Sequence, residues 1–245
     1  MRLHVTGATG YLGSELVRLR PDASVERVEI LDAAAVRGLF ERVRPAVVIH
    51  TAYRQTDPVV NVDGAENVAR AAATVGARLV HLSSDVVFDG LKGEPYVEED
   101  PLSPVNEYGS SKAEAERRVA AAHPEALIVR TSLIVGGAQP SAQPSKHELA
   151  ATGPGPWFTN EIRSPVQVTD LAQALLELAE LEVVGPLHVA GADGISRAGL
   201  AELIAGRPVP TEEATRARPL DCRLDSSRAQ AMIRTRLRGV REVLP

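Results

Sequence analysis

The chain alternates between short, continuously apolar runs and longer stretches with the apolar period of a helix, and this alternation leaves few folds open to it. The runs that predict buried strands are residues 3–6, 46–50, 78–83, 126–130 and 185–190. The segments that predict helices are residues 11–19, 33–44, 59–75, 108–122 and 169–181. Strand–helix–strand units of this length build a parallel sheet with helices on both faces. We therefore expect an α/β protein with a doubly wound parallel sheet.

Residues 21–31 occupy the place where such a sheet needs a further strand. Val25, Val28 and Ile30 supply its apolar residues, although the segment is short and interrupted by charges. Period and composition together favour an extended conformation only weakly here. We nevertheless expect a second strand in this segment.

The composition changes after residue 135. Residues 136–156 are rich in Gly, Pro, Ser, Gln and Ala, which predicts a loop with one short helix around 145–151. Beyond Ile195 the chain becomes helical and rich in arginine. We expect residues 1–135 to form the sheet domain and residues 136–245 to form a small lobe, interleaved with the last strands of the sheet.

Charge and cysteine content exclude several classes of protein. Among 245 residues, 27 Lys and Arg face 32 Asp and Glu, so the net charge of −5 argues against binding to nucleic acid or an anionic membrane. No apolar run approaches the roughly 20 residues of a membrane span. The single cysteine, Cys222, excludes a disulfide framework and a cysteine-built zinc site. We expect a globular cytoplasmic protein without a signal peptide.

A glycine-rich turn follows the first predicted strand and opens the first predicted helix. Gly7, Gly10 and Gly13 have the spacing that allows a tight turn, a close approach to a pyrophosphate, and close helix–sheet packing. The N-terminus of the helix then offers free N–H groups and a partial positive charge to the phosphates. The residues that we assign to this dinucleotide site are Gly7, Thr9, Gly10, Tyr11, Leu12 and Gly13.

The residue that binds the adenosine ribose is ambiguous. Glu26, Glu29 and Asp32 all lie about 20 residues beyond the turn, where an acid commonly binds the ribose hydroxyls. Arg27 lies beside them and suits a 2′-phosphate instead, or is a solvated surface charge. The cofactor is therefore NADP(H) or NAD(H), with NADPH slightly favoured.

Three residues form a candidate catalytic group. Tyr108 and Lys112 are neighbours on one face of a predicted helix, and Ser84 lies at the end of a predicted strand, the edge where ligands of parallel sheets bind. A phenol with a pKa of about 10 is a poor acid at pH 7, and a nearby ammonium lowers that pKa. We expect Tyr108 to exchange a proton with a carbonyl or alcohol oxygen, with Ser84 holding that oxygen and nicotinamide supplying hydride.

Together these features resemble the extended short-chain dehydrogenase/reductase superfamily and, within it, the dTDP-4-dehydrorhamnose reductases of deoxysugar biosynthesis. The resemblance runs from Arg2 to about Arg130, and more loosely to Asp225. The motifs that carry it are Gly7-x-x-Gly10-x-x-Gly13, residues 45–53, 61–64 and 81–90, Tyr96-x-Glu98-x-Asp100, residues 104–112 and Arg130-Thr131-Ser132. It implies a Rossmann-type sheet with a small C-terminal substrate lobe, and NAD(P)H-dependent reduction of a 4-keto-6-deoxy sugar nucleotide.

The resemblance also implies roles for individual residues. Ser84 takes the position of the catalytic hydroxyl, Tyr108 that of the general acid, and Lys112 that of the residue that binds the cofactor ribose and lowers the pKa of the tyrosine. Further cofactor contacts are implied for Asp32, Thr51, Ala52, Tyr53 and Ser83. Substrate contacts are assigned to Ser84, Asp85, Val86, Arg163 and Arg218, the two arginines as bidentate partners of an anionic group or else ordinary surface charges.

The chain departs from the family pattern in three respects. It is shortened around residues 21–31 and after Gly136, where we expect the remaining loop to close over substrate. Leu133 and Val135 replace the usual aromatic residues after Arg-Thr-Ser. Glu15 matches a glutamate through which relatives place a metal between subunits, but the companion acids are not found, so we predict no metal.

Other functions share part of this pattern. A 4,6-dehydratase needs an acid pair after the catalytic hydroxyl, and here Val86 follows Asp85. A 4-epimerase uses the same Ser, Tyr and Lys, but has a larger substrate lobe. A non-catalytic NAD(P)-binding regulatory subunit is the alternative from another class. The resemblance is compatible with a homodimer, and no feature supports a nucleic-acid or membrane partner.

Overall fold

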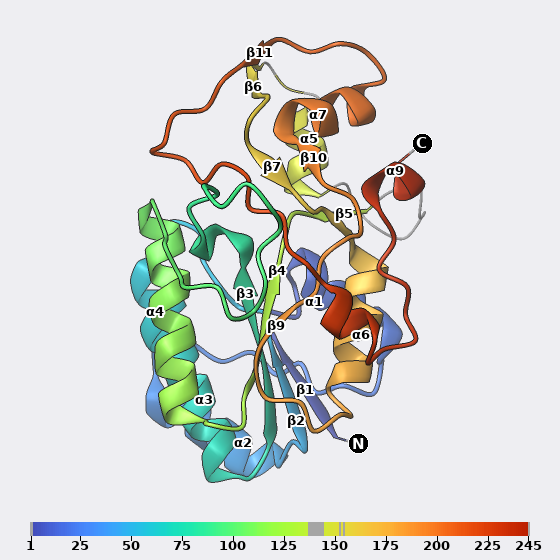
Figure 1. Cartoon of the computed structure of the whole chain (residues 1–245). Coiled ribbons are helices and arrows are strands. Elements are labelled where there is room, and N and C mark those ends of the chain that lie inside the picture. The colour runs from blue at the N-terminus through green and yellow to red at the C-terminus, as the bar shows by residue number, and fades with distance from the viewer. Residues whose placement is uncertain (1, 137–144, 152, 154, 245) are drawn as a thin grey trace.

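The computed structural model of the chain describes residues 2–136, 145–151, 153 and 155–244 (Figure 1). Its centre is a sheet of five strands whose neighbours all run parallel. In spatial order the strands are β1 (Leu3–Thr6), β2 (Val47–His50), β3 (Arg78–Ser84), β4 (Leu127–Thr131) and β9 (Gly185–His188). These five strands confirm the five continuous apolar runs, with bounds that shift by at most two residues.

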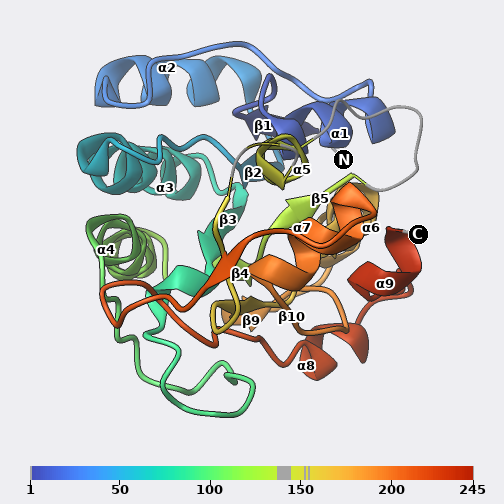
Figure 2. The same ribbon diagram turned by 90° about the horizontal axis from the view of Figure 1, so that it is seen from above.

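Helices cover both faces of this sheet, as predicted (Figure 2). One face carries α2 (Ala33–Val43), α3 (Ala65–Thr74) and α4 (Glu107–Ala122), and the other carries α1 (Tyr11–Leu19) and α6 (Val168–Leu178). Val47 and Ile49 of β2 pack toward α1 and α6, while Val48 packs toward the opposite helices. Continuous apolar strands are required because both faces are buried. In the described residues no helix is long and apolar enough to span a bilayer.

The strand predicted in residues 21–31 does not form, so that prediction was wrong. All of these residues are described, and Ser24 alone makes a bridge to His4 of β1. Val25 is then 44% exposed, while Ile30 is buried beside Gly64, where an added Cβ would lie 2.6 Å from its Cδ1 atom. The charged residues at 26, 27 and 29 keep the segment in solvent, and too few apolar side chains remain to hold a strand against the sheet.

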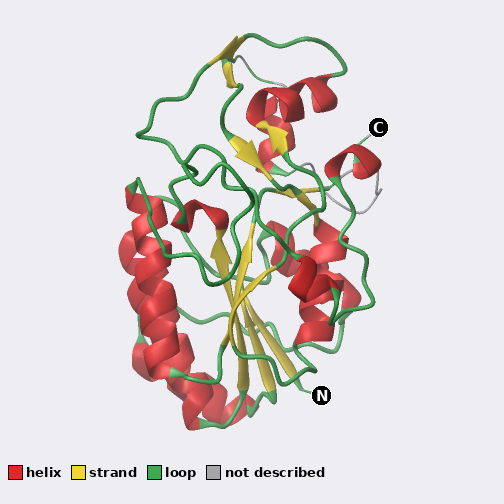
Figure 3. Ribbon diagram, viewed as in Figure 1, coloured by secondary structure: helices red, strands yellow, loops and turns green. Residues whose placement is uncertain are grey.

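Short elements of the second half of the chain lie above the carboxyl ends of the sheet strands, among long loops (Figure 3). They pair as β5 (Ile134–Val135) with β8 (Val166–Gln167), β7 (Ile162–Arg163) with β10 (Ile195–Ser196), and β6 (Trp157–Phe158) with β11 (Thr211–Glu212). Helices α5 (Lys146–Ala151) and α7 (Arg197–Ala205) lie there as well, and α9 (Val240–Val243) is the last helix. Helix α8 (Ser227–Gln230) instead packs beside the sheet, where Ala229 joins the core formed with α6 and β9 (Figure 1).

Helix α5 confirms the short helix predicted at 145–151. Residues 137–144, 152 and 154 of loop 136–156 lie outside the described residues, and its predicted closure over substrate stays a prediction. Through α6 and β9 the second half of the chain also contributes to the sheet itself. The domain division after residue 135 stays a prediction.

Three histidines lie inside the sheet on neighbouring strands. His4, His50 and His81 are at most 1% exposed, and the rings of His50 and His81 stack with centroids 5.3 Å apart. Within the described part of the chain, at least one ring nitrogen of each has no hydrogen-bond partner. Burial lowers the pKa of His4 to about 4 and that of His50 to about 3. All three rings are therefore neutral in the folded protein near pH 7.

This burial predicts acid sensitivity well above the range in which carboxylates titrate. In the unfolded chain these histidines bind protons below their ordinary pKa of about 6.5. The folded protein excludes those protons from His4 and His50 down to about pH 4, and burial also lowers the pKa of His81. The free energy of unfolding should therefore fall as the pH drops from 6.5, by up to about 1.4 kcal/mol per pH unit for each histidine. Urea titrations at pH 7.5, 6 and 5 measure this slope. His4→Asn should remove one histidine's share, and a flat profile would contradict the prediction.

Candidate active site

The glycine turn is built as its spacing predicts. Gly7 has φ +71°, and an added Cβ would lie 2.7 Å from the amide nitrogen of Ala52. A Cβ on Gly13 would lie 2.1 Å from the carbonyl oxygen of Gly7. The Thr51 hydroxyl donates to the carbonyl of Thr6 at 2.7 Å, which fixes the end of β2 beside the turn. Only glycine fits at positions 7 and 13, and the turn brings Gly7, Thr51 and Ala52 together.

The rest of the turn leads directly into α1. Gly10 is the N-cap of α1 and makes no side-chain capping hydrogen bond, so the first N–H groups of the helix are available to an anion. Thr9 and Gly10 are exposed, whereas Leu12 is buried and can contribute only its main chain. The Tyr11 hydroxyl is buried without a hydrogen-bond partner in the described residues. This arrangement is suited to a pyrophosphate.

Helix α4 packs unusually closely against the end of β3. Asn106 caps it, with its side-chain oxygen accepting from the Gly109 amide at 2.8 Å. A Cβ on Gly109 would lie 2.3 Å from the carbonyl oxygen of Val86, in the 3-10 turn η2 (Asp85–Val87). Because residue 109 is glycine, the tyrosine before it can approach Ser84, whose side chain acts to lower the pKa of Tyr108. Sequence reasoning had given Gly109 no role.

Lys112 does not act on Tyr108 as expected. Burial raises the pKa of Tyr108 above its ordinary value, with smaller contributions in the same direction from Tyr53 and Asp85. The Lys112 ammonium is buried and donates to the carbonyl of Leu82. Burial also lowers the pKa of Lys112 to about 8, against the charge of Glu116. The predicted lowering of the tyrosine pKa was therefore wrong for this structure, and Tyr108 is protonated at neutral pH, as a proton donor must be.

The two consecutive serines at the end of β3 face different surroundings. Ser84 donates to Asp85 at 3.1 Å, and its oxygen accepts from the amide of Val86 at 3.4 Å. Asp85 is 2% exposed, receives a 2.6 Å hydrogen bond from Ser132, and has its pKa raised by burial. Ser83 instead donates to the buried Glu116. Ser84 thus joins Tyr108, while only the main chain of Ser83 remains for a cofactor.

The two arginines assigned to substrate differ sharply. Arg163 is buried, and its guanidinium donates to three main-chain carbonyls and to Glu161, with Nε 3.6 Å from Asp85. These contacts occupy the donors that a bidentate anion contact needs, so we withdraw Arg163 as a direct substrate contact. Arg218 is 48% exposed in its side chain, donates to Glu161 at 2.8 Å, and lies 4.5 Å from the centre of the Phe158 ring. Arg218 remains a candidate.

Tyr53 lies beside Tyr108, with ring centroids 6.1 Å apart. It is 43% exposed, and its hydroxyl accepts a 3.1 Å hydrogen bond from Lys146, the first residue of α5. The same ammonium reaches Gln55 at 3.1 Å. Sequence reasoning missed this contact, although Lys146 is one of only three lysines in the chain.

Asp32 and Glu15 hold structural positions. Asp32 is exposed and caps α2 by accepting from the amide of Ala35 at 2.9 Å. Glu15 is buried, pairs with Arg18 at 2.7 Å, and accepts from Thr169 at 2.5 Å. In the described residues, no group of three His, Cys, Asp or Glu side chains is placed to hold a metal.

The parallel sheet, the glycine turn after β1 and the Ser–Tyr–Lys group at its carboxyl edge define a Rossmann-type protein of the reductase class. More particularly, the chain belongs to the family described as RmlD substrate binding domain, whose model matches residues 1–245. It is 35% identical over 226 residues to the dTDP-4-dehydrorhamnose reductase of Mycobacterium tuberculosis strain H37Rv, covering 83% of this chain and 74% of that protein.

Other relatives cover more of the chain. Methionine adenosyltransferase 2 subunit beta of Xenopus laevis is 30% identical over 297 residues, covering 99% of this chain and 87% of that protein. The crystal structure of the dTDP-4-dehydrorhamnose reductase from Bacillus anthracis in complex with NADP is 26% identical, with a TM-score of 0.86 over 99% of this chain and 96% of that one. A hypothetical dTDP-4-dehydrorhamnose reductase from Sulfolobus tokodaii is 29% identical, with a TM-score of 0.84 over 98% and 97%.

Proposed function

We propose that this chain is an NAD(P)H-dependent reductase that acts on the keto group of a 4-keto-6-deoxy sugar nucleotide. The observation that carries the proposal is the close packing of Gly109 against the carbonyl oxygen of Val86, which brings Tyr108 beside Ser84, one helical turn from the buried Lys112. The Mycobacterium tuberculosis relative and the NADP complex of the Bacillus anthracis protein support both the substrate and the cofactor.

The residues of the chain divide the chemistry between them. A dinucleotide held by the glycine turn would supply hydride to the carbonyl carbon. The hydroxyls of Ser84 and Tyr108 both donate to the carbonyl oxygen and stabilise the charge that develops there. Tyr108 then gives its proton to that oxygen, and Lys112, on the same helix face, would bind the cofactor ribose.

The structure also offers an argument for the preference between NADPH and NADH. The glycine turn would hold the pyrophosphate, with Asp32 near the adenosine. Arg27 is exposed and lines a surface groove with Gly38 and Arg42 of α2. Because its side chain is not engaged in any hydrogen bond or ion pair with the described residues, it would be available for a 2′-phosphate, which is why we favour NADPH.

The decisive measurement is the loss of absorbance from NADPH, and separately from NADH, in the presence of a dTDP-4-keto-6-deoxy sugar. Turnover by the purified chain is the expected result, and the faster cofactor identifies the preference. A protein that binds either cofactor but oxidises neither with this ketone would contradict the proposed substrate. NAD that cannot be exchanged from the purified protein would instead favour a 4-epimerase.

A non-catalytic regulatory subunit is the second candidate. The beta subunits of methionine adenosyltransferase 2 match 94–99% of this chain in five of the six species compared and 76% in Xenopus tropicalis, against 83% for the mycobacterial reductase. The intact Ser84, Tyr108 and Lys112 favour the enzyme. Stoichiometric co-purification with a partner enzyme, together with no turnover of any ketone, would favour the subunit. A homodimer and a cytoplasmic location remain predictions.

A further inference from the structure

Arg197 is a half-buried arginine without an anionic partner. It is the first residue of α7, and its guanidinium carbon lies 5.6 Å from the centre of the Trp157 ring. Its one side-chain hydrogen bond within the described residues joins Nη1 to the Nδ1 atom of His147 at a long 3.4 Å. No carboxylate of the described chain lies within ion-pair distance of it. Burial lowers the pKa of Arg197, because the charged group is poorly solvated.

The two fully buried arginines of the described residues are satisfied by the chain. Arg130 pairs with Glu116, and Arg163 with Glu161 and main-chain carbonyls. Arg78, which is half-buried like Arg197, donates to two main-chain carbonyls, but its Nε atom has no partner in the described residues. His147 cannot compensate the charge of Arg197. Burial lowers the pKa of His147 to about 3 and leaves its ring neutral. The guanidinium of Arg197 is only partly removed from water, and its unbonded nitrogens are not fully buried, so they remain accessible to an anion. Because partial burial of a charge without an anion costs free energy, an anionic ligand would stabilise it.

The surroundings of Arg197 place this positive charge near the reacting end of the site. Glu161 and Asp85 attract it, while Arg163 and Arg218 repel it. Glu161 is already paired with both of those arginines, and Asp85 is bonded to Ser84 and Ser132. The cluster therefore contains three arginines and only two acids, and both acids already have partners other than Arg197. Helix α7 lies above the carboxyl edge of the sheet, where Ser84 ends β3 (Figures 1 and 2).

We propose that Arg197 binds a phosphoryl group of the substrate, with Trp157 holding the plane of its guanidinium. A planar fork of donors suits the paired oxygens of a phosphate better than a point charge does. This inference rests on the proposed function, in which the anion is the diphosphate of the sugar nucleotide. It makes Arg197 a specificity residue that separates nucleotide-linked sugars from free keto sugars.

The test compares Arg197→Met with Arg197→Lys, and uses Arg207→Met, at an exposed position just after α7, as the matched control. Calorimetric binding of dTDP should weaken at least tenfold in Arg197→Met, less in Arg197→Lys, and not in Arg207→Met. Thymidine, which has no phosphate, should bind all four proteins alike. Unchanged dTDP affinity in Arg197→Met would overturn the proposal.

Thermal unfolding separates ligand binding from a structural role. If Arg197 binds an anion of the ligand, the free Arg197→Met variant should have a Tm no lower than that of wild type, because an unpaired, half-buried charge has been removed. The rise in Tm that dTDP or inorganic pyrophosphate produces in wild type should be lost. A Tm several degrees below wild type in the free variant would assign Arg197 to structure and contradict the proposal.

These readouts do not depend on turnover, so the two proposals can fail separately. A protein that reduces no keto sugar but binds pyrophosphate through Arg197 would refute the proposed reductase and keep the anion site. A protein that reduces the sugar nucleotide with an unchanged KM in Arg197→Met would refute the anion site alone. Wild-type protein that binds neither dTDP nor pyrophosphate would also refute the anion site.

Discussion

Tyr108→Phe is expected to lower kcat for keto-sugar reduction by about 10²- to 10⁴-fold, the contribution of a positioned proton donor, while the cofactor still binds. Phenylalanine keeps the ring but removes the hydroxyl that lies beside Ser84. The carbonyl oxygen then loses a hydrogen bond and its proton source at once. Single-turnover absorbance at saturating cofactor measures the step, and cofactor binding by fluorescence shows that the site remains formed.

Tyr53→Phe is the matched comparison. Its ring lies 6.1 Å from that of Tyr108, but its hydroxyl is bonded to Lys146. Its loss should change the rate far less, with the effect falling mainly on KM. If both variants lost activity equally, or if Tyr108→Phe kept kcat within a few fold of wild type, Tyr108 would not be the proton donor.

The fold was predictable because its strands are buried on both faces. Such strands read as continuous apolar runs, and five of them gave five strands in one sheet. The sixth, at 21–31, failed because its identity rested on three apolar residues among charges. Of these three, only Ile30 is buried in the structure, and it packs against Gly64 rather than in a strand. The local sequence pattern does not show that the Ile30 side chain packs against Gly64.

Local spacing also located the glycine turn and the Tyr108–Lys112 pair, since both lie on single short segments. Ser83 and Ser84 were harder, because adjacent strand residues point to opposite sides and the sequence does not say which side faces the ligand. The raised pKa of Tyr108 likewise depends on burial, which spacing does not report.

The arginines show most clearly what cannot be predicted from the sequence alone. In a chain with 24 of them, the sequence does not distinguish a buried guanidinium from a solvated one. Arg163 is buried because residues 219 and 220, more than 50 positions away, supply the carbonyls that satisfy it. Arg197 is half-buried through Trp157, 40 positions away, and only the three-dimensional arrangement shows that it lacks an anion.

Arg130→Met is expected to have the largest effect on stability, lowering the free energy of unfolding by about 3–5 kcal/mol. Arg130 of β4 and Glu116 of α4 are 4% and 5% exposed, and their charged groups form a fork with distances of 2.9 and 3.1 Å. The guanidinium also donates to the carbonyl of Glu98 and lies 5.3 Å from the centre of the Phe88 ring. Methionine fills the space but leaves the Glu116 carboxylate buried without its cation.

A double-mutant cycle separates the pair from its surroundings. Glu116→Gln removes the stranded charge, so the double variant Arg130→Met/Glu116→Gln should recover a substantial part of the loss in urea titrations at pH 7.5. Equal losses in the single and double variants would show that packing, not charge, is responsible.

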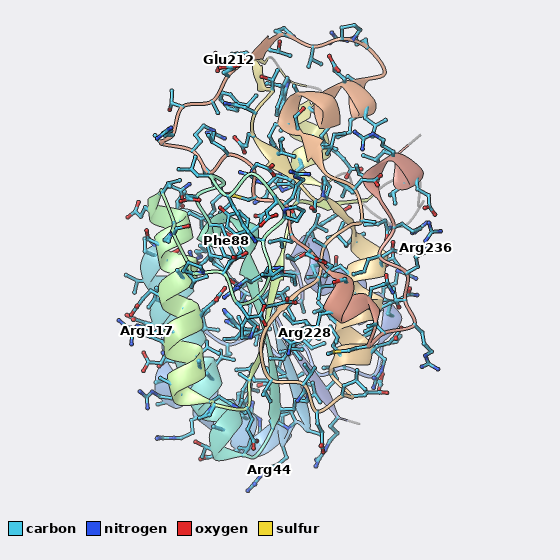
Figure 4. All side chains as sticks on the ribbon, in the orientation of Figure 1. Arg44, Phe88, Arg117, Glu212, Arg228 and Arg236 are labelled. Atoms are coloured by element: carbon cyan, nitrogen blue, oxygen red, sulfur yellow. The ribbon has the colours of Figure 1, made fainter. Side chains whose placement is uncertain are left out.

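Arg117→Met is the control for Arg130→Met, because Arg117 lies on α4, the helix that carries Glu116. Arg117 pairs with Glu114 at 2.5 Å, but its side chain is 68% exposed and points into solvent (Figure 4). Exposed pairs contribute about 0–1 kcal/mol, so this variant should stay within that range. Because Ser83 bonds to Glu116, and Lys112 lies one turn before it, Arg130→Met should also reduce turnover more than Arg117→Met does at a temperature where both are folded. A loss of stability below 1 kcal/mol in Arg130→Met would mean that α4 is held against β4 without this ion pair.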